Sequence, residues 1–286
     1  MTRASRLLAL ALVWAAPAAA QGARAPLMFS LHDADSRVTL LGSIHVLPES
    51  AYPLPASIDA AYAEAEQVAV EADIQDTDAV YAAVQAQSVY TDGRTLPAVL
   101  GASGFDELSG LLHRLGLPAD AAVTLKPWAV EAMLTALAAQ AGGFRTDLGV
   151  DVHLIARARA DGKPLRTLET AQEQIALFDA EPDSAQAASL LDAVRTWGQD
   201  DAGGEAMLAD LVRAWERGDE AALENVARDL PDALLGDRNA RWVPQIEDML
   251  ALEGQDVLVV VGAAHLVGDD SVVAMLRERG HAVTRH

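Results

Sequence analysis

Two apolar stretches, one near each end of the chain, both lead into a glycine that a histidine follows three residues later. Residues 38–41 precede Gly42-Ser43-Ile44-His45, and residues 257–261 precede Gly262-Ala263-Ala264-His265. A short apolar run that ends at glycine is typical of a buried strand, and glycine there lets other groups approach the backbone closely. The pattern predicts an α/β core to which both ends of the chain contribute strands.

Hydrophobic periodicity and turn residues predict the other elements. We expect a β-hairpin from residues 27–31 and 37–46, and further strands at 67–71, 165–169, 256–261 and 281–285. We expect helices at 56–66, 78–89, 104–115, 127–141, 149–160 and 269–279, with Thr170 and Glu173 as the capping box of another.

These elements predict the fold class and the domain organisation. The expected fold is α/β, with a mixed sheet built from the N- and C-terminal segments and a large helical insertion at about 78–253. Residues 21–286 are expected to form a single domain.

The first residues have the three parts of a secretory signal peptide. Arg3 and Arg6 precede an apolar run, and Ala18-Ala19-Ala20 provides a small-residue cleavage site. We expect cleavage after Ala20 and a periplasmic or secreted product. Neither this run nor a later one is long enough to predict a membrane span.

Composition excludes several kinds of site. The chain has 286 residues, a formal net charge of −21 and no cysteine. The acidity disfavours binding to the phosphate backbone, so we expect no nucleic-acid partner. The lack of cysteine excludes disulfides, thiol catalysis and thiolate metal sites.

Four ionisable side chains lie at or just beyond the ends of four predicted strands, namely His45, Glu71, Glu169 and His265. Sites in α/β sheets form at the carboxyl ends of strands, so these side chains converge if the strands are neighbours. We expect His45, His265 and Glu71 to hold a divalent metal ion (Mn, Co or Zn), and a carboxylate free of the metal to act as general base. An alternative role for Glu169 is to cap the helix that starts immediately after it.

Several motifs together resemble the TraB/GumN family, also called TraB/PrgY. They are residues 40–46, 52–55, 70–73, 149–154, 162–164, 168–174, 238–239 and 261–268. The resemblance covers nearly all of the chain after residue 20. It implies kinship with the TIKI metalloproteases, whose activity depends on two G-x-x-H motifs, and a core like that of erythromycin esterase and ChaN. By resemblance, His45 and His265 are the paired motif histidines, Glu71 is the acidic residue after the third strand, and Arg238 is the arginine of the late motif.

Three functions remain open at this point. The first is a periplasmic metal-dependent hydrolase, specifically a peptidase, with Glu71, Arg238 and Glu169 as catalytic residues. The second is a metal-independent hydrolase in which His and Glu activate water directly. The third is a non-catalytic protein that binds a peptide or a metal ion or assists polysaccharide export. The expected substrate is a peptide or a small molecule, and the sequence leaves the oligomeric state open.

Overall fold

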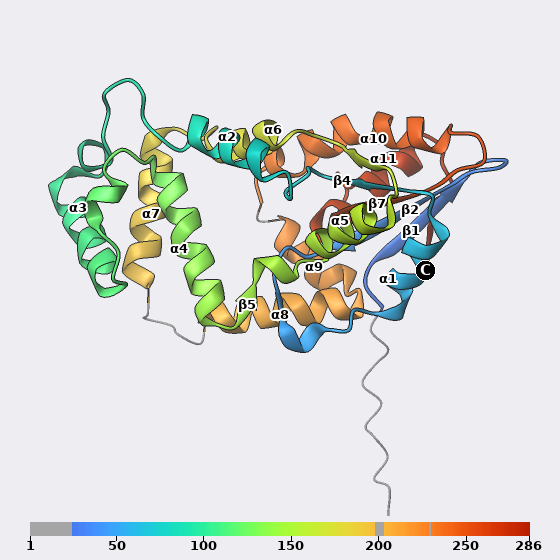
Figure 1. Cartoon of the computed structure of the whole chain (residues 1–286), viewed down its shortest axis with the longest axis horizontal. Coiled ribbons are helices and arrows are strands. Elements are labelled where there is room, and N and C mark those ends of the chain that lie inside the picture. The colour runs from blue at the N-terminus through green and yellow to red at the C-terminus, as the bar shows by residue number, and fades with distance from the viewer. Residues whose placement is uncertain (1–24, 198–202, 229) are drawn as a thin grey trace, which may run out of the picture.

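The computed structural model describes residues 25–197, 203–228 and 230–286, and its centre is a six-stranded sheet in the order β6-β4-β7-β2-β1-β8 (Figure 1). The strands are β1 (Met28–His32), β2 (Arg37–Ser43), β4 (Gln67–Val70), β6 (Leu165–Thr167), β7 (Asp256–Gly262) and β8 (Thr284–Arg285). The fold class is therefore α/β with a mixed sheet, as predicted. The predicted signal peptide lies outside the described residues.

Four neighbouring strands are parallel. β2 and β4 each pair with β7, and β6 pairs with β4. β1 is antiparallel to β2, which confirms the predicted hairpin, and it also pairs antiparallel with β8. Consecutive valines make β7 buried through most of its length, as expected for a strand covered on both faces. The carboxyl ends of all four parallel strands thus meet at one edge of the sheet.

The helices are close to those predicted. They are α1 (Ala56–Glu64), α2 (Thr77–Gln87), α3 (Leu96–Arg114), α4 (Pro127–Ala141), α5 (Val150–Asp161), α6 (Ala171–Phe178), α7 (Asp183–Thr196), α8 (Gly203–Arg217), α9 (Glu220–Arg228), α10 (Gly236–Leu250) and α11 (Val272–Glu278). Thr170 and Glu173 form the predicted capping box at the start of α6.

The structure departs from the predictions in two places. Helix α3 begins at Leu96, before the predicted helix at 104–115, and a kink at Gly101 (φ 72°), which only glycine accepts readily, separates its first part from the predicted one. The sequence also gave no sign of a second, two-stranded sheet, in which β3 (Leu47–Pro48) pairs with β5 (Phe144–Arg145). Its two short strands lack the alternation by which strands are recognised.

The buried apolar residues form two clusters. The larger surrounds the six-stranded sheet and includes Trp215 and Trp242. The smaller joins α3, α4 and α7, which stand together at the end of the molecule away from the hairpin (Figure 1). Helices α2 and α6 pack against each other between these two regions. Among the described residues, no helix is long and apolar enough to cross a membrane.

Candidate functional site

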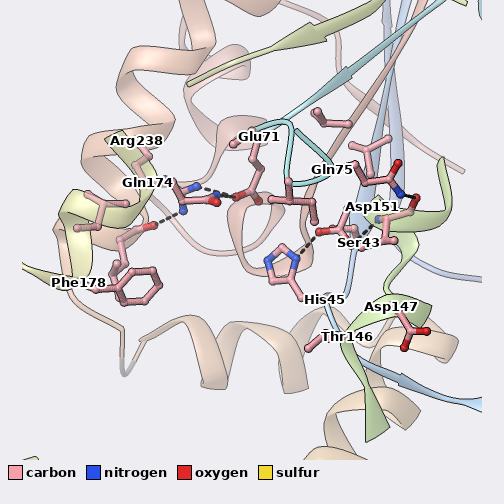
Figure 2. Close-up of a pocket in the computed structure, with 17 residues that line it drawn as sticks. Ser43, His45, Glu71, Gln75, Thr146, Asp147, Asp151, Gln174, Phe178 and Arg238 are labelled. Atoms are coloured by element: carbon pink, nitrogen blue, oxygen red, sulfur yellow. Dashed lines mark hydrogen bonds and ion pairs between the residues drawn. The ribbon is translucent and has the colours of Figure 1, made fainter. Parts of the chain in front are cut away.

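A cavity of about 500 Å³ opens beside the carboxyl ends of the parallel strands (Figure 2). His45 and Glu71 line it, and Arg238 of α10 reaches it from above the sheet edge. Glu169 and His265 lie behind this surface, both buried and both in contact with Arg238. The structure therefore brings together all of the predicted site residues.

Arg238 is the centre of a buried ionic cluster. Its Nη2 donates to Glu71 Oε2 at 2.6 Å and to Glu169 Oε1 at 2.5 Å, and Nε donates to Glu169 Oε2 at 3.1 Å. Its Nη1 donates to the backbone oxygen of Leu234 and to Nε2 of His265, both at 3.0 Å. A guanidinium has five N–H groups, so all five are engaged within the protein. Arg238 is placed to position these side chains.

Glu71 is held as an anion. Its Oε1 accepts the backbone N–H of Gly262 at 2.6 Å, and its Oε2 also accepts from Gln174 at 3.2 Å. Burial alone raises the pKa of a carboxyl group, but the nearby histidines, Arg238 and the Gly262 N–H outweigh it and lower the pKa of Glu71 to about 2. A carboxylate with so low a pKa is a weak base at neutral pH.

His265 is buried and neutral. Its Nδ1 donates to Asn239 Oδ1 at 2.6 Å, so Nε2 accepts from Arg238, and both ring nitrogens have partners. The ring lies 4.5 Å from that of Trp242, between centroids. Burial, with the charge of Arg238, lowers the pKa of His265 to about 4 despite the opposing charge of Glu71.

His45 has the opposite environment. Its Nδ1 donates to Asp151 Oδ2 at 2.5 Å, and its side chain is 60% exposed at the cavity, which leaves Nε2 open (Figure 2). Desolvation lowers the pKa of His45, but the hydrogen bond and charge of Asp151, with the charge of Glu71, raise it to about 9. His45 is thus an oriented imidazole that takes up a proton readily.

Close backbone packing brings Asp151 to His45. Gly149 precedes α5, and Val150 N–H donates to the carbonyl oxygen of Ile44 at 3.0 Å. A Cβ on Gly149 would lie 2.6 Å from both Asp151 Oδ1 and the His45 carbonyl oxygen, closer than real contacts allow. Glycine at 149 therefore permits the approach that sets Asp151 behind the imidazole.

Gly262 marks the point where the two G-x-x-H motifs meet. An added Cβ there would lie 3.3 Å from Glu71 Oε1 and 3.7 Å from His45 Nε2. The lack of a side chain at 262 leaves one position within contact distance of both groups. A reacting atom at that position would touch the open imidazole and the fixed carboxylate together.

The predicted metal ligands were tested against this geometry. Their nitrogen and oxygen donors suit a divalent ion. However, Nε2 of His265 and both oxygens of Glu71 already accept hydrogen bonds from the protein. Within the part of the chain that the structure describes, no three His, Cys, Asp or Glu side chains are arranged to hold a metal ion. As arranged here the set does not fit an ion, and the metal-ligand roles stay a prediction.

Sequence reasoning did not single out three residues that complete the site. Asp151 and Asn239 each orient one predicted side chain, and Gln174 donates to both Glu71 and Glu169. All three lie inside the motifs quoted above, which was the available signal, but their spacing did not show which partner each would meet. His153, also on α5, packs against Tyr52 with 5.7 Å between the ring centroids.

Fold and site together define an α/β protein with a buried carboxylate–arginine cluster beside an open His–Asp pair. The sequence model of the TraB/PrgY/gumN family matches residues 27–285, and the chain belongs to that family. It is 28% identical over 240 residues to the uncharacterized protein YbaP of Escherichia coli (strain K12), an alignment that covers 83% of this chain and 87% of that protein. The uncharacterized protein YbaP of Shigella flexneri matches equally well. No solved structure matches the chain significantly.

Proposed function

We propose that this chain is a hydrolase of peptide or related acyl bonds in which His45 is the general base. The observation that carries the proposal is the pairing at His45, where Nδ1 is bound to Asp151 and Nε2 faces the cavity. An imidazole oriented in this way by a carboxylate is the common arrangement for proton transfer in hydrolases.

The proposed reaction begins when Nε2 of neutral His45 takes a proton from a water that attacks the substrate carbonyl. Asp151 stabilises the imidazolium that forms. The tetrahedral adduct then collapses, and His45 returns the proton to the leaving amine or alcohol. Because the pKa of His45 is about 9, the fraction of active base increases with pH up to that value.

We assign positioning roles to the buried cluster. Arg238 and Glu169 fix Glu71, whose negative charge helps to hold the developing imidazolium at His45. Gly262 leaves space for the reacting atoms between the two groups. This division assigns proton transfer to the exposed side of the site and electrostatic stabilisation to its interior.

A metal-dependent peptidase is the second candidate. A histidine that binds a metal usually donates its other ring N–H to a carboxylate, as His45 does to Asp151. Coordination of the metal by His265 as well would require Arg238 to give up its hydrogen bond to Nε2 of His265. This requirement is why we favour the metal-independent reaction. That reaction also suits the proposed likeness of the core to erythromycin esterase, which an experimental structure would test.

We further propose that the chain is exported and cleaved after Ala20. The basic start, the short apolar run and the A-x-A site support this. Mass spectrometry of the N-terminus from a periplasmic extract would test it, and recovery of the intact N-terminus in that extract would contradict it.

Turnover and metal content, measured on the same preparations, test the function. The chain from Gln21 onwards is purified without chelator, and its metal content and its hydrolysis of a fluorogenic peptide pool are measured. Both measurements are repeated after dialysis against EDTA and after addition of Mn²⁺, Co²⁺ or Zn²⁺. We expect turnover that survives EDTA and falls roughly 10²- to 10⁴-fold in His45→Ala.

Activity that disappears with the metal and returns on its addition would favour the second candidate. Folded protein with no turnover under any condition would refute both hydrolase proposals and leave a binding protein. His113→Ala is the matched control, since His113 lies near the end of α3, away from the cavity.

A further inference from the structure

The lining of the cavity combines apolar side chains with the site residues His45 and Glu71. The apolar side chains include Ile74, Leu177, Phe178 and Leu234. Figure 2 shows Phe178 on one side of His45, with Thr146 and Asp147 on the other. The cavity is therefore amphipathic, with apolar side chains beside the ionisable groups.

Phe178 is a large apolar side chain that folding leaves exposed to solvent. It is the last residue of α6, and it is 46% exposed. Among the large hydrophobic residues found exposed in the described chain, only Phe178 lines the cavity. An exposed aromatic side chain that lines a cavity commonly marks a binding site.

Contacts with α4 hold Phe178 in place. Its ring stacks on Trp128 at 5.8 Å between centroids, with an interplanar angle of 19°. Next to it, Asp179 accepts a hydrogen bond from Lys126 Nζ at 2.6 Å. The ring is thus a fixed platform, which reduces the entropy lost when a ligand packs on it.

Ser43 contributes an independent observation. It lines the cavity two residues before His45 and is only 3% exposed. Its hydroxyl has no hydrogen-bond partner among the described residues. A buried hydroxyl without a partner costs free energy, which a ligand that supplies the partner recovers. Any peptide ligand carries such partners in its main-chain amide and carbonyl groups.

The charges disfavour an anionic ligand. Three carboxylates line the cavity, from Glu71, Asp147 and Asp151, and all N–H groups of Arg238 already have partners. Each of the three carboxylates is also paired within the protein, Glu71 with Arg238, Asp151 with His45 and Asp147 with Arg145. Because the lining charges are paired in this way, the complementary ligand is uncharged and partly apolar.

We propose that the cavity binds a peptide unit with a large uncharged apolar side chain. The side chain packs on Phe178 and its apolar neighbours, and a main-chain amide or carbonyl group bonds to Ser43. This inference deepens the proposed function and rests on it only for the cleavage of the bound peptide.

Binding of three blocked tripeptides to the His45→Ala variant tests the inference without turnover. The probes are N-acetyl-Ala-Xaa-Ala-amides with Phe, Ala or Glu at the centre, measured by isothermal titration calorimetry. We expect the Phe peptide to bind at least tenfold more tightly than the Glu peptide. A second change, Phe178→Ser, should abolish this preference, and Phe178→Leu should retain part of it.

Ser43→Ala should weaken all three peptides by a similar factor, because the main-chain group is common to them. Tyr81→Ser is the control, since Tyr81 is a 67% exposed aromatic residue that does not line the cavity, and this change should alter nothing. Equal affinity for Phe and Glu peptides, or a preference that Phe178→Ser leaves intact, would overturn the inference. Thermal denaturation of each variant checks that it is folded.

Turnover of the same peptides by the unmodified chain separates the two proposals. Binding with the expected preference but without cleavage would refute the hydrolase and keep the peptide site. Cleavage of the Phe and Glu peptides at equal kcat/KM would keep the hydrolase and refute the apolar preference.

Discussion

The ends of β2 and β7 carry the same G-x-x-H motif but have opposite environments. His45 after β2 is open to the cavity, is bound to a carboxylate and has a pKa raised to about 9. His265 after β7 is 3% exposed, has both ring nitrogens engaged and has a pKa lowered to about 4. Identical motifs therefore acquire different properties from the side chains that surround them, and we assign proton transfer to one and positioning to the other.

The largest expected effect is a loss of stability when Arg238, which contacts His265 after β7, is replaced. Arg238→Met leaves the carboxylates of Glu71 and Glu169 buried without their counter-ion. Removing one partner of a buried ion pair costs about 3–5 kcal/mol of unfolding free energy. Urea denaturation at neutral pH measures this.

Arg279→Met is the control for Arg238→Met. Its ion pair with Glu247 is exposed at the arginine, so the change should lower the free energy of unfolding far less than Arg238→Met does. If the two variants lost similar stability, Arg238 would not hold the site together.

On the β2 side, Asp151→Asn removes the charge behind His45 while it keeps the size of the side chain. We expect kcat/KM to fall roughly 10²-fold or more, since proton transfer depends on the oriented imidazole. The pKa of His45 should also fall, because the main contributions that raise it come from Asp151. The rising limb of the pH–rate profile should then move to lower pH, a shift that a merely structural role for Asp151 would not produce.

Gly262→Ala tests whether reaction takes place between His45 and Glu71. The backbone at Gly262 (φ −51°, ψ 136°) suits alanine, but the added methyl would lie 3.3 Å from Glu71 Oε1 and 3.7 Å from His45 Nε2. We expect a folded protein whose turnover is reduced about tenfold or more, because a displacement on the order of 1 Å is costly in a reacting geometry. Circular dichroism checks that the variant is folded, and kinetics on the same sample measure its turnover. Normal turnover would place the reaction elsewhere in the cavity.

The smallest expected effect is the pH dependence of stability. Because folding raises the pKa of His45 from 6.5 to about 9, the protonated form stabilises the fold fully below pH 6.5. This contribution is lost as pH rises through about 9, whereas activity should increase over the same range. Exposure of the ring screens the effect. The stability difference between the unmodified chain and His45→Ala should shrink from pH 6 to pH 9, and a difference that grew would contradict the proposed protonation.

Much of the core could be predicted from local patterns. The hairpin, the capping box at Thr170 and helix α4 (Pro127–Ala141) occur as expected, because each depends on residues close together in the chain. The kink at Gly101 and the β3–β5 sheet could not be predicted in this way. The sheet joins segments that are almost a hundred residues apart in the chain.

The sequence by itself determined the family, the α/β class and the positions of His45, Glu71, Glu169 and His265 after four strands. Parallel pairing then makes these residues meet at one sheet edge. Only the tertiary structure decided what each of them does there. Asp151 is 106 residues away from His45 in the chain, and Arg238 is 167 residues away from Glu71. These distant partners make burial and charge differ between the two equal motifs. Protonation and accessibility depend on those distant partners, and local sequence does not encode them.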